Sequence, residues 1–121
     1  MNFLFVGMGG ALGSMMRYAI SLILWKGQFP VLTLCTNVIG AIMIGFVTGL
    51  AAQKNISQSW MMFLKTGLCG GFTTFSTFSL ESFILMENGR HGLSVLYMIS
   101  SVLLCLMGIW LGMAVSRKCC G

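Results

Sequence analysis

Residues 67–79 read Gly67-Leu68-Cys69-Gly70-Gly71-Phe72-Thr73-Thr74-Phe75-Ser76-Thr77-Phe78-Ser79 and lie within an apolar run over 60–86. The run is long enough to cross a membrane, which takes roughly 20 residues of α-helix. Paired glycines followed by paired β-branched threonines continue a helix poorly, so the stretch predicts a break near 70–75. Backbone freed at that depth must be satisfied by protein, water or an ion, because lipid offers no hydrogen bonds. The alternative is a kinked packing helix whose hydroxyls bond back to the preceding turn.

The rest of the chain has the composition of a membrane protein. Of its 121 residues, 57% are hydrophobic and 7% are charged, and its mean hydropathy is +0.93. Three further apolar runs cover 3–25, 31–52 and 93–115. The sequence therefore predicts an all-α integral membrane protein, a single domain over 1–121 with four transmembrane helices, the third broken near its middle. The short loops leave no room for a soluble catalytic or nucleic-acid-binding domain, so we expect neither an enzyme nor a nucleic-acid partner.

Local signals predict the connections and the packing. The loop over 26–30 is short, so the first two helices should be antiparallel neighbours, and Ser57 or Ser59 should cap the third helix. Each helix also carries two glycines four residues apart, a spacing that lets helix backbones approach closely in lipid. The pairs are Gly9 and Gly13, Gly45 and Gly49, Gly67 and Gly71, and Gly108 and Gly112. They predict a dense bundle.

Two charged residues interrupt the apolar runs at informative places. Arg17 lies in the first run, where it either snorkels to the lipid head groups or sets a positive potential at a pore mouth. Glu81 is the carboxylate well inside the third run. We expect it to pair with Lys65 or Arg17 of another segment, or to act as a cap.

These motifs resemble the small bacterial fluoride channels of the Fluc, or CrcB, family. The run over 70–78 is the most specific part of the resemblance. Weaker parts follow in the same order as in the family: Gly9-Gly10-Ala11-Leu12-Gly13 with Arg17, Thr36-Asn37 with Gly40, and Tyr97 with Ser101. The resemblance therefore covers essentially the whole chain.

The resemblance implies a passive, fluoride-selective channel that exports fluoride from the bacterial cytoplasm and confers fluoride resistance. It implies a multi-pass protein of the cytoplasmic (inner) membrane, surrounded by lipid. It also implies an antiparallel homodimer of dual topology, with two pores that both copies build. The basic residues at the two ends allow either orientation. Lys54, Arg117 and Lys118 lie at one end, with a weak addition from Lys65, and Lys26 and Arg90 lie at the other, plus Arg17 if it snorkels outward.

The resemblance also assigns roles to single residues. Phe75 and Phe78 match the phenylalanines whose ring edges face fluoride, and Asn37 matches the pore asparagine. The further pore positions are hydroxyls, namely Ser76, Thr77, Tyr97 and Ser101. Gly70 and Thr73 match the positions whose backbone carbonyls hold a structural sodium ion at the dimer interface. Cys105 departs from the family pattern, since a hydroxyl is expected a turn beyond Ser101 and a thiol donates poorly.

Residue chemistry supports an anion pathway. Amide and hydroxyl donors can replace the water around fluoride, and aromatic edges carry the positive part of the ring quadrupole. A proton-coupled small multidrug transporter is the first alternative, but it needs an acidic residue deep in the first helix, and 3–25 contain none. A non-transporting assembly subunit is the second, but it leaves Asn37 and the helix break without a use.

Overall fold

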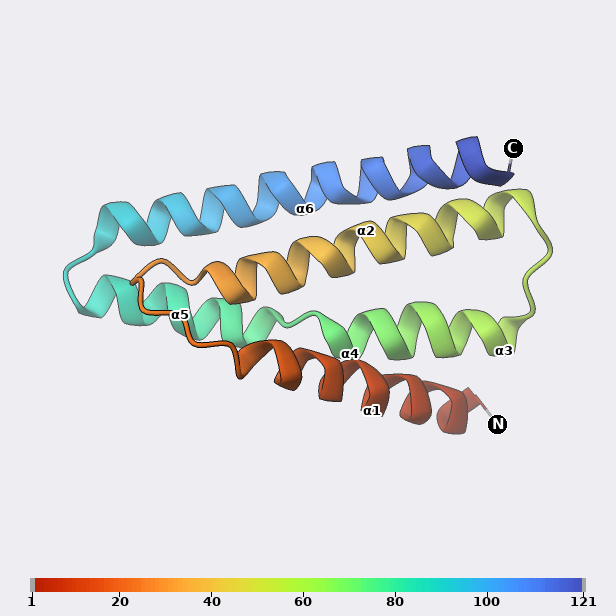
Figure 1. Ribbon diagram of the computed structural model, residues 1–121, viewed down its shortest axis with the longest axis horizontal. Helices are drawn as coiled ribbons and strands as arrows, with labels where there is room; N and C mark the ends of the chain where they lie inside the picture. The colour runs from red at the N-terminus through yellow and green to blue at the C-terminus, as the bar shows by residue number, and fades with distance from the viewer. Residues whose placement is uncertain (1, 121) are drawn as a thin grey trace.

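The computed structural model describes residues 2–120, and these form helices joined by short loops, without a strand in the described range. Three helices are long and apolar enough to cross a membrane: α1 (Asn2–Ser21), α2 (Val31–Gln53) and α6 (His91–Cys120). The third predicted helix is divided into pieces (Figure 1). These are α3 (Gln58–Met61), the π-helix η1 (Met62–Cys69), α4 (Gly70–Phe72) and α5 (Phe75–Glu87). Four membrane-length segments are therefore present, one of them broken.

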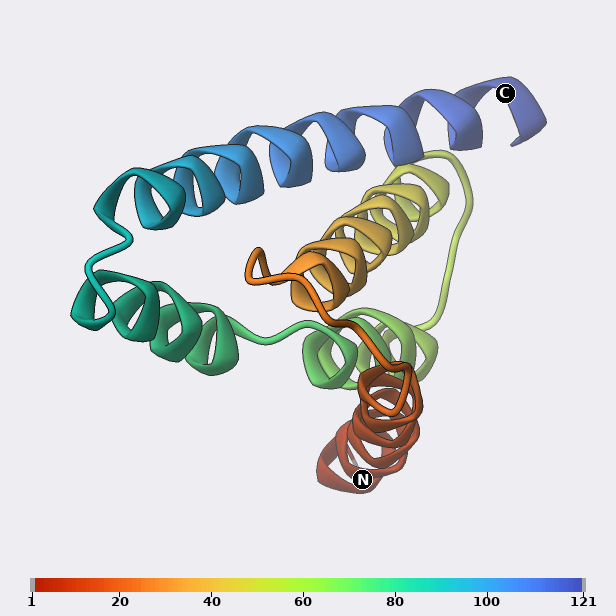
Figure 2. The same cartoon turned by 60° about the vertical axis from the view of Figure 1, so that its left-hand side comes forward.

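The break lies at Thr73 and Thr74, within the predicted stretch. Both residues are extended, with φ and ψ of −84° and 159° at Thr73 and of −147° and 118° at Thr74. The break separates α5 from α4, so α5 packs against α6 while η1 and α4 pack against α1 (Figure 2). The π-helix before the break was not expected from the sequence. Such wide turns occur frequently at functional sites.

Two boundaries differ from the prediction. The first helix ends at Ser21 instead of 25, because the chain turns at Leu22 and Ile23, whose amides reach back only three residues. Trp25 then donates from Nε1 to the Phe29 carbonyl at 2.9 Å and closes the loop. The last helix runs to Cys120 instead of 115, where Arg117 lies in the last turn and favours a helix C-terminus. Hydropathy reports only the length of an apolar run. It therefore detects neither the turn after Ser21 nor the polar end of the last helix.

The glycine pairs pack helix backbones together, as predicted. A methyl group on Gly13 would contact the Leu68 carbonyl and would lie 2.7 Å from the Phe72 nitrogen, and one on Gly112 would lie 2.7 Å from the Phe46 nitrogen. The first glycine contact joins α1 to η1 and α4, and the second joins α2 to α6. The first two helices are antiparallel, as predicted, but they touch little, because each packs mainly against another segment. The glycine-bearing faces instead pack α1 against η1 and α4, and α2 against α6.

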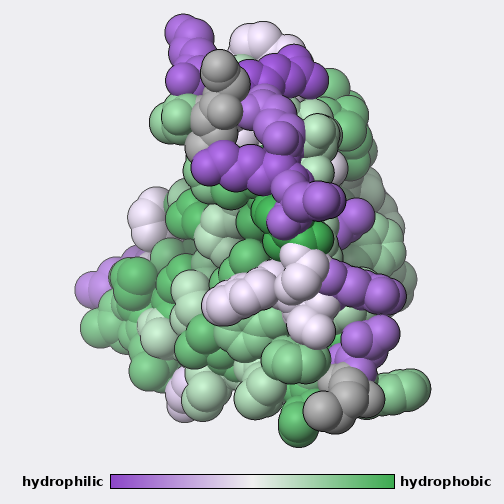
Figure 3. All heavy atoms as spheres, turned by 90° about the vertical axis from the view of Figure 1, so that its right-hand side faces the viewer, coloured by the Kyte–Doolittle hydropathy of each residue, from purple (hydrophilic) through white to green (hydrophobic). Residues whose placement is uncertain are grey.

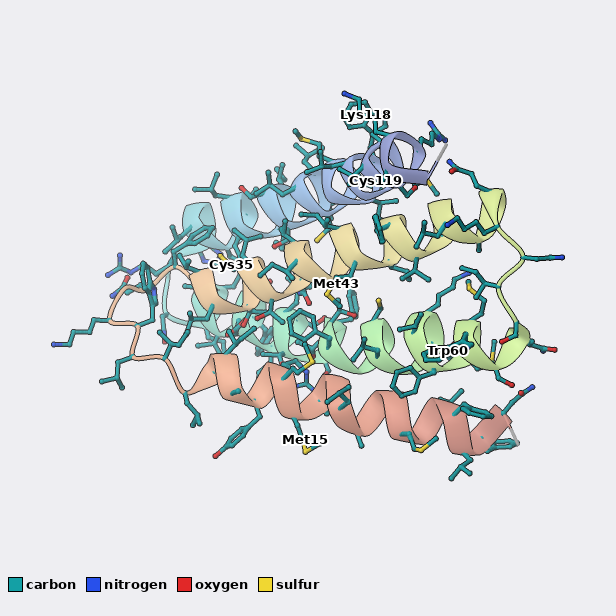
Figure 4. All side chains as sticks on the ribbon, turned by 45° about the vertical axis from the view of Figure 1, so that its right-hand side comes forward. Met15, Cys35, Met43, Trp60, Lys118 and Cys119 are labelled. Carbon is teal, nitrogen blue, oxygen red and sulfur yellow. The ribbon has the colours of Figure 1, made fainter. Side chains whose placement is uncertain are left out.

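The outer faces of the helices are apolar. Met15 on α1 points away from the bundle (Figure 4) and is 61% exposed, and Trp110 on α6 is 69% exposed. The buried apolar residues are few, namely Ala41, Cys69, Phe72, Leu85 and Tyr97. A soluble protein would bury such side chains, so these faces suit lipid. At the entry to the third segment Ser57 is the cap, and its hydroxyl accepts from the Trp60 amide at 3.4 Å.

Candidate functional site

A groove of about 330 Å³ opens beside the helix break. It lies between α2, the broken segment and the middle of α6. Its lining residues are Asn37, Gly40, Ala41, Ile44, Cys69, Gly70, Thr73, Thr74, Phe75, Phe78, Ser101, Val102 and Cys105. None of these side chains carries a charge. Six of the predicted site residues therefore meet at one place, from three segments distant in sequence.

Asn37 holds the break from the α2 side. Its Nδ2 donates to the Thr74 carbonyl at 3.2 Å, and its Oδ1 accepts from the Thr74 amide at 2.8 Å. Thr74 in turn caps α5, because its hydroxyl accepts from the Thr77 amide at 3.1 Å. The extended residue is thus fixed on both sides. The amide of Asn37 keeps one N–H for a further acceptor, since an NH₂ group carries two donors.

The carbonyls freed at the break divide into satisfied and unsatisfied ones. The Cys69 carbonyl accepts from the amide and the hydroxyl of Thr73, at 3.1 and 3.0 Å. This hydroxyl bonds back to the preceding turn, as the kinked-helix alternative expected. The carbonyls of Gly70 and Thr73 accept no hydrogen bond from residues 2–120. Both residues line the groove, and both are the positions that the sequence analysis singled out for a cation.

Two phenylalanine rings stand at the start of α5. Phe75 is 79% exposed in the single chain, and its ring centre lies 5.6 Å from that of Phe78 with the planes at 45°. Phe78 is half-buried and contacts Tyr97, with 5.2 Å between ring centres. Tilted rings turn edges toward the space beside them, and ring edges are electropositive. The groove therefore offers weak attraction to an anion without a formal charge.

Of the predicted pore hydroxyls on α6, Tyr97 and Ser101, only one is directed into the groove. Ser101 lines it, and its hydroxyl is buried without a hydrogen-bond partner among residues 2–120. Cys105, one turn further along, lines it as well. Tyr97 does not line the groove: it is fully buried, and its hydroxyl donates to Glu81 at 2.9 Å. A phenol has one proton, so this donor is already engaged.

Glu81 is held by hydroxyls, and the expected pairing with Lys65 or Arg17 was wrong. Its Oε2 accepts from the Thr33 hydroxyl at 3.0 Å, and its Oε1 accepts from Tyr97. Lys65 is exposed on η1. The role of Thr33 was missed, because no spacing in the sequence links it to a residue 48 positions away.

Arg17 points into the fold, which contradicts the snorkelling alternative. Its Nε donates to the Gly71 carbonyl at 3.1 Å. A smaller cavity of about 110 Å³ lies beside it, lined also by Ile20, Ser21, Leu32, Thr33, Thr36, Thr74 and Thr77. Of the predicted pore hydroxyls, Thr77 thus faces this cavity instead of the groove. Ser76 is exposed, and its hydroxyl lies 3.3 Å from that of Thr74.

Comparison with known proteins adds an independent line of evidence. Residues 4–113 match the family described as CrcB-like protein, Camphor Resistance (CrcB). A relative from Nitrobacter hamburgensis, named fluoride-specific ion channel FluC 2, is 41% identical over 97% of this chain and 98% of its own. Two further relatives, both named fluoride-specific ion channel FluC, are 40% identical to this chain. The one from Methylobacterium nodulans covers 98% of both chains, and the one from Agrobacterium fabrum covers 97% of both.

Proposed function

Because this chain belongs to the CrcB family, we propose that it is a passive, fluoride-selective channel that exports fluoride and thereby confers fluoride resistance. The observation that carries the proposal is the uncharged groove at the break. It combines the edges of Phe75 and Phe78 with the unpartnered hydroxyl of Ser101 and the spare amide proton of Asn37. The relatives' names support fluoride as the ion, and the apolar outer faces support a membrane location, which we propose is the bacterial inner membrane.

The groove suits fast permeation. Fluoride is small and strongly hydrated, so a pathway must replace its water with N–H and O–H donors. Asn37 and Ser101 supply such donors on facing elements. The two rings add attraction that is weaker than that of a full charge. An ion held this weakly leaves readily, which conduction requires.

A second copy in the opposite orientation would complete the groove. Phe75 extends out of the single chain with 79% of its surface exposed, and the groove beside it is open on that side. In an antiparallel homodimer the other copy would cover this ring in place of lipid, and each groove would receive the ring of its partner. The site is therefore assembled from both chains. Lipid covers the remaining apolar faces.

A structural sodium ion fits the break. The carbonyl oxygens of Gly70 and Thr73 accept no hydrogen bond within the described chain, and hard oxygen ligands suit a hard cation. No group of three His, Cys, Asp or Glu side chains in residues 2–120 could hold a metal. When bound, sodium would supply the charge that the carbonyl dipoles need at the interface of the two copies. The protein's own part is to keep both carbonyls free.

A flux measurement tests the proposal. Purified protein reconstituted into liposomes should release a fluoride load passively, recorded with a fluoride electrode, and should exclude chloride strongly. Comparable chloride flux would contradict the selectivity. A requirement for a proton gradient would favour the transporter class instead, although α1 over Asn2–Ser21 contains no acidic residue to couple protons.

A further inference from the structure

Arg17 continues the glycine face of α1. Gly9, Gly13 and Arg17 are spaced by four residues and therefore share one side of the helix. The two glycines bring the α1 backbone against η1 and α4, where even a methyl group would collide with Phe63, Leu68 or Phe72. One turn further along, the long side chain of Arg17 reaches over α4. Its Nε donates to the Gly71 carbonyl at 3.1 Å.

The Gly71 carbonyl is one of the groups that the break leaves open. A helix end leaves its last carbonyls without amide partners, and α4 ends at Phe72. Thr73 and Asn37 satisfy the carbonyls of Cys69 and Thr74. Arg17 satisfies that of Gly71, whereas those of Gly70 and Thr73 accept no hydrogen bond from the part of the chain that the structure describes. Among the described residues the Phe72 carbonyl also accepts no hydrogen bond, but of these three open carbonyls only those of Gly70 and Thr73 belong to residues that line the groove.

We propose that Arg17 is a positioning residue that fixes the helix break. By holding Gly71 on the α1 side, it sets the direction in which Gly70, Thr73 and the following Phe75 are presented to the groove. The proposal rests on the channel function for its effect on flux, whereas its structural part concerns the break alone. It differs from a role at a pore mouth, where the positive charge and not the N–H group would matter.

Three substitutions separate the donor from the charge. In Arg17→Gln the amide nitrogen stands the same number of bonds from Cα as Nε, so the donor is kept and the charge is lost. In Arg17→Lys the charge is kept and a methylene occupies that position. In Arg17→Met a methyl group occupies it, and both properties are lost. Lys65→Met is the matched control, because it removes an exposed cation from η1.

Hydrogen exchange of backbone amides in detergent micelles measures how often the backbone at the break opens, and the measurement needs no fluoride. We expect the amides of 72–77 to exchange about tenfold faster in Arg17→Met, as the loss of one hydrogen bond to a charged group implies. Arg17→Lys should lose most of this protection, and Arg17→Gln and Lys65→Met should keep it. Amides of α2 and α6 should not change. Fluoride flux should follow the same order as the protection.

The proposal is overturned if Arg17→Gln exchanges as fast as Arg17→Met, if Arg17→Met retains full protection, or if exchange accelerates equally in α6. If Arg17→Met does not fold, the comparison of the Gln and Lys variants decides in the same way. Flux that follows the charge, with Lys active and Gln inactive, also overturns it. If the wild-type chain carries no fluoride, the proposed function fails while the exchange result stands separately.

Discussion

At the scale of single residues, hydrogen bonds that cross the chain define the site. The side-chain NH₂ group of Asn37 donates to the Thr74 carbonyl, and its side-chain oxygen accepts from the Thr74 amide. One side chain thus fixes the extended backbone and also lines the groove. The Tyr97 hydroxyl donates its hydrogen bond to Glu81 and therefore does not donate into the groove. Ser101, in contrast, has a buried hydroxyl that no group in the described part of the chain satisfies, which costs free energy unless a ligand or a second copy does so.

Asn37→Asp should abolish fluoride flux. The substitution replaces the donor to the Thr74 carbonyl with a carboxylate oxygen, and it places a negative charge on the path of an anion. Losing the hydrogen bond alone should cost about 1–3 kcal/mol. Asn37→Ala is the control, since it removes the bonds without adding charge. Liposome flux checks the prediction, and flux equal to wild type in the Asp variant would remove Asn37 from the pathway.

Phe75→Ile and Phe78→Ile should each cut fluoride flux severely while the protein stays folded. Isoleucine keeps most of the apolar volume and loses the ring quadrupole. The Phe78 variant should also lose about 0.5–1.5 kcal/mol of stability with its ring contact to Tyr97. Phe83→Ile is the control, because Phe83 lies exposed on the same helix and does not line the groove. Normal flux in both variants would return the two rings to a packing role.

At the scale of elements, backbone contact through glycine decides which helices are neighbours. Gly9 and Gly13 of α1 lie on η1 and α4, and Gly45 and Gly49 of α2 lie on α6, where a methyl on Gly45 would meet the Ile109 carbonyl. In lipid this close packing replaces the hydrophobic drive that water provides. It holds η1 and α4 in place, while α5 on the other side of the break follows α6.

Gly13→Ala and Gly7→Ala should change stability in opposite directions. A methyl group on Gly13 collides with backbone atoms of Leu68 and Phe72, which cannot move cheaply, so we expect a loss of about 1–3 kcal/mol. One on Gly7 meets nothing within 4 Å, and alanine's better helix propensity should add up to about 1 kcal/mol. Thermal unfolding in detergent measures both. Equal stability of the two variants would contradict the proposed packing role of Gly13.

At the scale of the whole molecule, the basic residues are nearly balanced between the two ends. Lys54, Arg117 and Lys118 are exposed at the end that holds the C-terminus and the loop after α2 (Figure 1), and Figure 3 shows hydrophilic residues gathered there. The opposite end carries Lys26 and Arg90. Because Arg17 points inward, it adds to neither end. Three residues against two, with a weak addition to the first end from the exposed Lys65 early in the third segment, give no decisive orientation under the positive-inside rule.

We therefore expect the chain to insert in both orientations. A single reporter cysteine at Lys54, in a variant otherwise free of cysteine, should react with an impermeant reagent on intact cells to about half of its total after lysis, because near-equal charge bias favours neither orientation. A second variant, with cysteines at both Lys54 and Arg90, would test the antiparallel arrangement. In an antiparallel dimer, cross-links should join position 54 of one copy to position 90 of the other. Labelling near zero or near completion would contradict dual topology.

The sequence by itself determined the number of membrane-length segments, the break within 70–75, a serine cap at 57 or 59 and the glycine packing, because each depends on local length, spacing or propensity. The order of its motifs also identified the family. Only the tertiary structure decided that Thr73 and Thr74 are the extended residues, that α1 pairs with η1 and α4, and that Tyr97 faces Glu81 instead of the groove. It alone placed Arg17 on Gly71, 54 residues away. Such contacts depend on how helices rotate and approach in three dimensions, and spacing along one chain carries no record of that.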